Sequence, residues 1–349
     1  MFELFLHLCL AGDPAVCATH MVPSAVALTE ADCNATAGGR SDGWLTDHSG
    51  LTLTNVECRG LTPSDAISVV QVADGVWAHK GVSAEVSMDN LGDIANLGFI
   101  VGKDAVAVID AGGTRTIAEG LYAAIRQVTD LPIRYLILTH MHPDHALGAD
   151  VFREAGAEIV GNVHLADALQ RRAETYEVNF QRLIGAKANI GLKVALPDRG
   201  VEGQLVLDLG AREVLLQSYK TAHTNNDLTV FDKTSETLFA GDLVFLELTP
   251  VVDGALMGWL AVLADMSKLE VKFMVPGHGA IPQPWPEGLS DVTTYLEALR
   301  DQTRAAVAEG ISLSDAIETV AQDQRGNWQA FDLNHPRNAT VAHTELEWE

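Results

Sequence analysis

The sequence predicts an α+β fold in which two mixed β-sheets pack face to face and helices cover their outer faces. Short apolar stretches that predict strands fall into two groups, residues 67–110 and 205–245, and helical patterns lie before, between and after these groups. Because each sheet must bury an apolar face, this order favours a four-layer αββα sandwich.

In the first half, strands are expected at residues 67–72, 76–79, 97–101 and 106–110, which are apolar and separated by Gly or Asp turns. A helix is expected over residues 116–129, where apolar side chains recur at helical spacing and Thr116 with Glu119 fits a capping box. The β-branched and aromatic run at residues 133–138 predicts a buried strand. A helix over 146–155 and a strand over 158–161 complete this half.

The second half begins with a helical stretch, residues 168–192, and a loop over 193–201 that contains Pro197 and Gly200. Strands are expected between residues 205 and 245 and again at 271–275. Helices are expected at 257–269 and 291–309, followed by a polar tail, residues 334–349.

All four cysteines, Cys9, Cys17, Cys33 and Cys58, lie in an N-terminal arm, residues 1–62, of which residues 11–62 are expected to be irregular. Residues 63–349 are expected to form the catalytic domain with its C-terminal helices and tail. An even number of cysteines in a small arm predicts two disulfides in an oxidising compartment, with three pairings possible. Four reduced thiols remain the alternative, and a zinc site of four thiolates is disfavoured because no Cys-x2-Cys pair occurs.

The first ten residues are apolar but lack a basic start and include Glu3, so we interpret them as an amphipathic element of the mature protein and not as a signal peptide. With the cysteines, this predicts a periplasmic or secreted protein whose export signal is not present in this chain. No apolar stretch reaches 18 residues, so no transmembrane segment is expected. A net charge of −24 argues against nucleic acid or an anionic membrane as partner.

The expected strand at 133–138 ends in a cluster of metal-ligand residues, Thr139-His140-Met141-His142-Pro143-Asp144-His145. His140 and His142 are two residues apart, so in extended backbone both can reach one metal ion. Pro143 suits the first turn of a helix, which would swing Asp144 and His145 away from that pair. This pattern predicts a second metal beside the first.

Three more candidate ligands follow short apolar runs, each next to Gly, Pro or Asn. They are His223 in Ala222-His223-Thr224-Asn225-Asn226-Asp227, Asp242 in Gly241-Asp242, and His278 in Pro276-Gly277-His278. We expect all three at strand ends in loops, where binding sites are usually built. His164 is expected to be an ordinary helix-start or surface histidine.

This set resembles the signature of the metallo-β-lactamase-fold hydrolases, in which His-x-His-x-Asp-His precedes a lone His, a Gly-Asp turn and Pro-Gly-His. The resemblance covers residues 67–285. It implies Zn²⁺, two per chain, one held by His140, His142 and His223 and the other by Asp144, His145 and His278, with Asp242 bridging both. Ala222 and Asn225-Asn226-Asp227 depart from the residues common in the family.

The resemblance also implies the chemistry. Two zinc ions would share a hydroxide that attacks the substrate, with Asp144 orienting it and His140 and His142 holding the metal, so these three are the expected catalytic residues. An Asp at position 242, where true β-lactamases usually have Cys or Ser, favours ester or thioester hydrolysis of the glyoxalase II kind on a small-molecule substrate.

Alternatives remain open at this point. One is β-lactam hydrolysis, and another is a non-hydrolytic di-iron or metal-binding protein, although the flavodoxin-like domain of flavin-linked di-iron relatives is not visible here. Structural zinc without turnover is a third. The cysteine arm, the tail and the His223 region also resemble the quinoprotein relay system zinc metallohydrolases, which implies a functional link to quinoprotein dehydrogenases.

Supporting roles are predicted for a few further residues. Asp227 is either a hydrogen-bond partner of a ligand histidine or a turn cap, and Thr139 and Asn226 are further candidates for such partners. Tyr176, Phe180 and Arg182 are candidates for substrate contact. The sequence predicts neither an oligomeric state nor a specific substrate.

Overall fold

Seven strands form the larger central sheet of the computed structural model, which describes residues 1–349. They are β4 (Val70–Ala73), β5 (Val76–His79), β6 (Leu97–Val101), β7 (Val106–Ile109), β8 (Ile133–Ile137), β9 (Glu158–Asn162) and β10 (Arg199–Val201), in the order β10-β9-β8-β7-β6-β5-β4. Pairing is antiparallel from β4 to β7 and parallel from β7 to β10. The sheet is therefore mixed, as predicted.

The second central sheet has five strands in sequence order. They are β11 (Gln204–Asp208), β12 (Glu213–Ser218), β13 (Leu228–Asp232), β14 (Thr237–Phe245) and β15 (Phe273–His278). Only β14 and β15 pair in parallel, and the helix α6 (Leu256–Met266) lies in the connection between them. Parallel neighbours need such a crossover.

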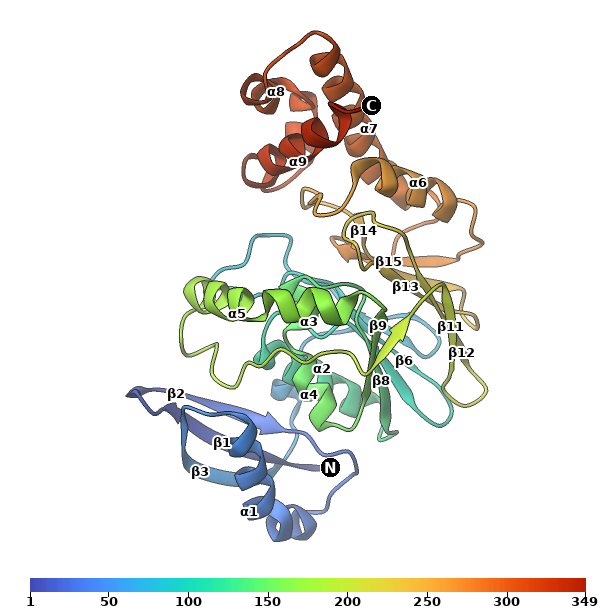
Figure 1. The fold of residues 1–349 in the computed structure, drawn as a ribbon. Coiled ribbons are helices and arrows are strands. Elements are labelled where there is room, and N and C mark those ends of the chain that lie inside the picture. Colours follow the sequence, from blue (N-terminus) through green and yellow to red (C-terminus); the bar gives the residue numbers. More distant parts are fainter.

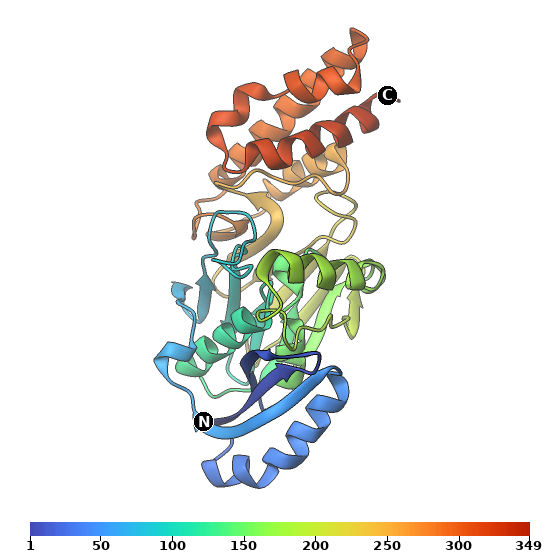
Figure 2. The ribbon, with the colours of Figure 1, turned by 90° about the vertical axis from the view of Figure 1, so that its left-hand side faces the viewer.

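Helices cover both outer faces of the two sheets, which gives the four-layer αββα sandwich that the sequence predicted (Figures 1 and 2). An apolar cluster between the sheets includes Ile109 and Ile137 from one sheet and Val230 and Val275 from the other. Beyond the larger sheet lie α2 (Arg115–Val128), α3 (Pro143–Ala146), α4 (Ala149–Glu154) and α5 (Leu165–Ile184). Beyond the smaller sheet lie α6, α7 (Ser290–Ala308), α8 (Leu313–Thr319) and α9 (Phe331–Leu346).

Several expected boundaries were wrong. The cap of α2 is Thr114, whose side chain accepts from the Ile117 N–H, and not Thr116. The single helix expected at 146–155 is two short ones, α3 and α4, separated at Gly148. The expected polar tail forms most of α9, because His335, Asn338 and Ala342 recur on one buried face.

The N-terminal segment is not an irregular arm. It forms a three-stranded antiparallel sheet of β1 (Phe2–Leu10), β2 (Asp13–Val22) and β3 (Leu51–Gly60), ordered β2-β1-β3, with the helix α1 (Glu30–Asp47). Leu4, Leu6 and Leu8 alternate on β1 and are fully buried, which is the period of a strand packed on one face.

Two disulfides cross this segment, as predicted, and the structure selects one of the three pairings. Cys9 on β1 bonds to Cys17, its direct partner on β2. Cys33 on α1 bonds to Cys58 on β3. Two disulfides fit an oxidising compartment. None of the helices is both long and apolar enough to cross a membrane.

Candidate metal centre

Both central sheets deliver side chains to one site between their edges. His140 and His142 follow β8, and Pro143 starts α3, which carries Asp144 and His145. The other three come from the second sheet: His223 before β13, Asp242 within β14, and His278 at the last residue of β15. The structure thus brings together all seven residues singled out in the sequence, although Asp242 lies inside a strand and not in a loop.

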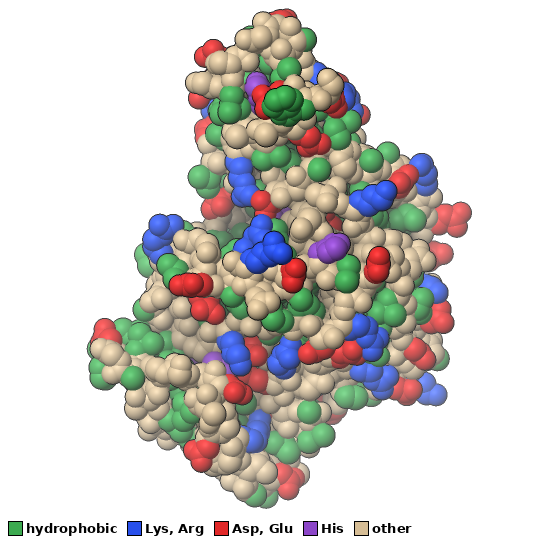
Figure 3. All heavy atoms as spheres, viewed as in Figure 1, with side chains coloured by type: hydrophobic (Ala, Val, Ile, Leu, Met, Phe, Trp, Pro, Cys, Tyr) green, Lys and Arg blue, Asp and Glu red, His purple; other side chains and the backbone are tan.

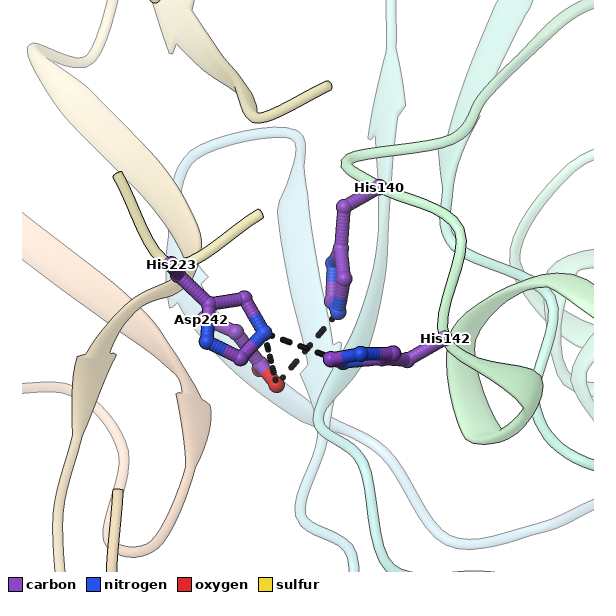
Figure 4. A group of neighbouring side chains, drawn as sticks. All are labelled: His140, His142, His223 and Asp242. Carbon is purple, nitrogen blue, oxygen red and sulfur yellow. Dashed lines mark hydrogen bonds and ion pairs between the residues drawn. The ribbon is translucent and has the colours of Figure 1, made fainter. Parts of the chain in front are cut away.

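The first cluster joins His140, His142, His223 and Asp242, whose ligand atoms lie within 4.8 Å of one another (Figure 4). His223 Nε2 is 3.0 Å from His142 Nδ1. Asp242 Oδ2 is 3.4 Å from His140 Nε2 and 3.5 Å from His223 Nε2.

The second cluster joins Asp144, His145 and His278. Asp144 Oδ2 lies 3.5 Å from His145 Nε2 and 3.4 Å from His278 Nε2. Asp242 also reaches this cluster, with Oδ1 3.1 Å from His145 Nε2 and Oδ2 3.4 Å from His278 Nε2. One carboxylate therefore touches imidazoles of both clusters.

Hydrogen bonds on the far side of each ring fix which nitrogen faces the site. His223 Nδ1 lies 2.6 Å from the Val251 carbonyl oxygen and His278 Nδ1 lies 2.9 Å from the Ile94 carbonyl oxygen. A carbonyl oxygen only accepts, so each Nδ1 carries the proton and each Nε2 presents a lone pair. This second partner of a ligand histidine is the usual arrangement around protein-bound metals.

Two further aspartates, which sequence reasoning missed, hold His145 and His142 in the same way. His145 Nδ1 lies 2.7 Å from Asp110 Oδ2. His142 is turned the other way: its Nε2 lies 3.2 Å from Asp253 Oδ2, so its Nδ1 faces the cluster. In the sequence both aspartates look like turn residues, because Asp110 precedes Ala111-Gly112 and Asp253 precedes Gly254.

Several buried atoms of the site lack a partner within the protein, which tests whether a metal fits. His140 Nε2, His145 Nε2 and Asp242 Oδ1 are buried and make no hydrogen bond. The facing atoms His142 Nδ1 and His223 Nε2 both present lone pairs only 3.0 Å apart, an arrangement that repels unless a cation lies beside both. Imidazole nitrogens and carboxylate oxygens are donors that transition metals accept. The residues present fit a metal.

The electrostatics differ between the clusters. Burial lowers the pKa of His140 to about 4 and the pKa of His223 well below its usual value, so both rings are neutral, as ligation requires. Burial acts in the same direction on His145, but Asp242, Asp144 and Asp110 outweigh it and raise its pKa well above normal. His145 is therefore more strongly influenced by neighbouring carboxylates than His140 and His223 are.

Two glycines explain the Gly-Asp and Pro-Gly-His patterns. Gly241 has φ of +52°, in the left-handed region, and a Cβ there would lie 2.8 Å from Thr139 Cβ. A Cβ on Gly277 would lie 1.9 Å from Asp242 Oδ1. The first close approach brings β14 against Thr139, next to His140, and the second brings β15 against Asp242.

The predicted supporting residues had mixed outcomes. Thr139 Oγ1 donates to Asp110 Oδ2 at 2.8 Å and lies 3.1 Å from His140 Nδ1, so it supports that ring as predicted. Asp227 is a turn cap: it accepts from the Thr224 N–H and hydroxyl, and burial raises its pKa to about 7. The Asn226 amide bonds Asn225 and none of the ligand histidines, so that prediction was wrong.

The three candidate substrate-contact residues on α5 differ in their surroundings. Tyr176 is half-buried on the inner face, whereas Phe180 is buried against Leu147 and Ile184 and serves the core. Arg182 is exposed and makes no hydrogen bond or ion pair. His164 is exposed at the start of α5, as predicted.

The profile of the metallo-beta-lactamase superfamily matches residues 91–278, more than half of the chain and all seven residues of the two clusters. The chain belongs to this superfamily. No curated protein sequence matches it.

Solved structures of the superfamily share the fold at low sequence identity. A metallo-beta-lactamase from Pontibacter korlensis is 18% identical, with a TM-score of 0.53 over 66% of this chain and 98% of that one. One from Hirschia baltica is 19% identical, with a TM-score of 0.52 over 66% and 97%. The metallo-beta-lactamase fold suggests a metallohydrolase. About a third of this superfamily member has no counterpart in these structures.

Proposed function

We propose that this chain is a dinuclear zinc hydrolase that cleaves an ester or a thioester. The observation that carries the proposal is the position of Asp242, whose two oxygens lie within 3.5 Å of imidazoles from both clusters. A carboxylate so placed suits a pair of cations better than a single one, and the donor set is one that zinc takes.

In this proposal His140, His142 and His223 would hold one ion, Asp144, His145 and His278 would hold the other, and Asp242 would contribute to both sites. When bound, the two ions would supply an activated water and polarise the carbonyl of the substrate. Because this water would be the nucleophile, no nucleophilic Ser or Cys is required. The products are a carboxylate and either an alcohol or a thiol.

The remaining work falls to residues of the chain. Asp110, Asp253, and the carbonyl oxygens of Ile94 and Val251 each accept one imidazole N–H and so keep the opposite nitrogen aimed at the site. Asp144 keeps 12% of its side chain exposed, whereas Asp242 keeps 3%. Of the two carboxylates in the clusters, Asp144 is therefore the better placed to orient the attacking water and accept its proton.

The division of the chain follows from the same assignment. We propose that residues 63–349 form the catalytic domain and that residues 1–62 form an appended segment, because no residue of the two metal clusters comes from the latter. The two disulfides favour the periplasm or the exterior. Membership of the quinoprotein relay branch, and with it a link to quinoprotein dehydrogenases, remains a proposal that rests on the sequence resemblance.

β-Lactam hydrolysis is the second candidate, because the structural neighbours are themselves described as metallo-beta-lactamases. The carboxylate at position 242 weighs against it, since the family resemblance places Cys or Ser there in true β-lactamases. Thioester or ester cleavage is therefore placed first.

The test combines metal analysis with a substrate screen. We expect two zinc ions per chain, and turnover of thioesters or lactones in preference to phosphodiesters and β-lactams. Asp144→Asn keeps the shape of the side chain but removes its basicity, and should lower kcat by about 10²–10⁴-fold. Two iron ions with reduction of O₂ or NO, or no hydrolysis above the Asp144→Asn level, would overturn the proposal.

A further inference from the structure

The inner face of α5 changes character beside the metal site. Buried apolar residues recur along it at helical spacing, namely Leu165, Leu169, Phe180 and Ile184. Between them, Arg172 and Tyr176 occupy the same stripe, one turn apart, and are only half-buried. The helix therefore turns a guanidinium and a phenol inward where it would otherwise bury apolar side chains.

Arg172 has no partner in the protein. It makes no hydrogen bond and no ion pair, and the only other arginine of which this is true is the exposed Arg182. The chain has 47 Asp and Glu side chains against 23 Lys and Arg, so most arginines have an acidic side chain available as a partner. A half-buried guanidinium without an acceptor, in so acidic a protein, indicates a group that binds an external acceptor.

A second guanidinium, on α9, lies beside Asp253, a carboxylate whose pKa the charge of Arg172 also lowers. One nitrogen of Arg337 donates to Asp253 Oδ1, while Asp253 Oδ2 accepts from His142. The Arg337 side chain is 54% exposed, so its other N–H groups remain available. Lys and Arg side chains lie on both sides of the hollow between α5 and the C-terminal helices (Figure 3).

Tyr176 lies among these charges. Burial raises the pKa of its hydroxyl, and the charges of Arg172, Asp253, Asp144 and Arg337 also act on it. Tyr176 also packs against the cluster that contains Leu147, the residue that follows α3. The stripe of Arg172 and Tyr176 therefore lies beside the helix that carries Asp144 of the second cluster.

From this geometry we propose that Arg172, Tyr176 and Arg337 form an anion-binding subsite at the mouth of the metal site, and that the substrate carries a carboxylate or phosphate group. That the anion is part of a substrate rests on the proposed function. Asp253 makes no hydrogen bond to Arg172, because its two oxygens accept from His142 and Arg337. Guanidinium groups bind carboxylate and phosphate oxygens through paired N–H donors.

The test compares charged and neutral substrates of equal length in the zinc-loaded, full-length protein. The probes are a glutaryl thioester, its neutral methyl ester, and a thioester that ends in a phosphate monoester. Arg172→Ala should raise KM for the charged thioesters by about tenfold or more, the effect of losing one charge-assisted hydrogen bond, and leave KM for the neutral one unchanged. The larger of the two charged responses identifies carboxylate or phosphate as the preferred group.

Arg182→Ala is the matched control, since it removes an unpartnered arginine from the outer face of the same helix. Equal changes in KM for charged and neutral thioesters in Arg172→Ala, or no change in either, would overturn the subsite. Tyr176→Phe should also raise KM for the charged thioesters.

A separate measurement keeps the subsite testable if no thioester is hydrolysed, which would instead refute the proposed function. Calorimetric titration with glutarate and with inorganic phosphate should then give a Kd about tenfold weaker for Arg172→Ala than for Arg182→Ala. Equal Kd values in the two variants would refute the subsite itself.

Discussion

The two ends of the chain are attached to the sandwich in different ways. The N-terminal segment, residues 2–60, has its own small apolar cluster around Leu4, Leu6 and Trp44, and two disulfides within it. It places only Phe5 and Met21 in the apolar cluster of α2 and the larger sheet. Its other buried contacts with the core include polar ones, such as Glu3 with Tyr122 and the Met21 carbonyl with Arg115. The C-terminal helices, residues 290–346, instead share one continuous apolar cluster with α6 and β14 of the sandwich.

The ends also differ in their distance from the metal centre. Asn338 on α9 accepts from the Val252 N–H at 2.9 Å and donates to the Pro250 carbonyl at 2.6 Å. It thereby fixes the loop that presents the Val251 carbonyl to His223 and the Asp253 carboxylate to His142. The N-terminal segment makes no such contact. Only the C-terminal end therefore helps to position residues of the metal site.

The strongest test removes the charge that joins the N-terminal segment to the core. Arg115 is 2% exposed and donates to Glu154 and to the Met21 carbonyl, with Glu119 also 2.8 Å away. Arg115→Ala leaves buried carboxylates unpaired, so we expect a loss of about 3–5 kcal/mol in the free energy of unfolding. Denaturant titration measures the loss.

Arg171→Ala is the control for this variant, because Arg171 pairs with Asp167 on the surface and should contribute about 0–1 kcal/mol. Zinc content of folded Arg115→Ala should equal that of the unaltered protein. A lower zinc content would contradict the comparison, because it would link the N-terminal segment to the site.

The C-terminal counterpart is Asn338→Ala. Removing the amide leaves the buried Val252 N–H and Pro250 carbonyl without partners, which should cost about 1–3 kcal/mol of stability. Because the same loop carries Asp253, we also expect zinc affinity to fall about tenfold, measured by competition with a chelator. Thr344→Ala, an exposed change on the same helix, should alter neither the stability nor the zinc affinity. An unchanged zinc affinity in Asn338→Ala would show that α9 does not support the metal site.

Sequence patterns predicted the sandwich and the seven clustered residues because both depend on local order. The His-x-His-x-Asp-His spacing fixes four side chains within one strand end and one helical turn. The other three candidates lie within or next to short apolar strands. The residues behind the ligands were missed for the opposite reason. Asp253 lies 111 positions from His142, and nothing in Val252-Asp253-Gly254 separates it from an ordinary turn.

The N-terminal segment shows a signal that was present but misread. Leu4, Leu6 and Leu8 alternate with period two, as a one-sided strand requires, yet the run was interpreted only as an amphipathic element. Composition rich in Ala, Gly and Thr suggested irregular backbone in residues 11–62, where tertiary pairing and the disulfides impose two strands and a helix. Weak propensity was overridden by long-range contacts.

The last expected effect is a pH dependence of stability that originates in the N-terminal segment. Glu3 is fully buried on β1 and accepts a hydrogen bond from the Tyr122 hydroxyl at 2.6 Å. Burial raises the pKa of its carboxyl to about 7, from an ordinary value of 4.5. Between these two values the folded chain keeps the proton and the unfolded chain has lost it.

Stability from this group is therefore fully present below about pH 4.5 and declines as pH rises to about 7. The neutral Glu3→Gln should abolish that slope, and at pH 8 its free energy of unfolding should exceed that of the unaltered protein by on the order of 3 kcal/mol. Denaturant titration across the pH range measures the difference. Glu57→Gln, an exposed change on β3, is the control. Zinc content at pH 8 should be the same in all three proteins, because Glu3 belongs to the N-terminal segment, which makes no contact with the metal site.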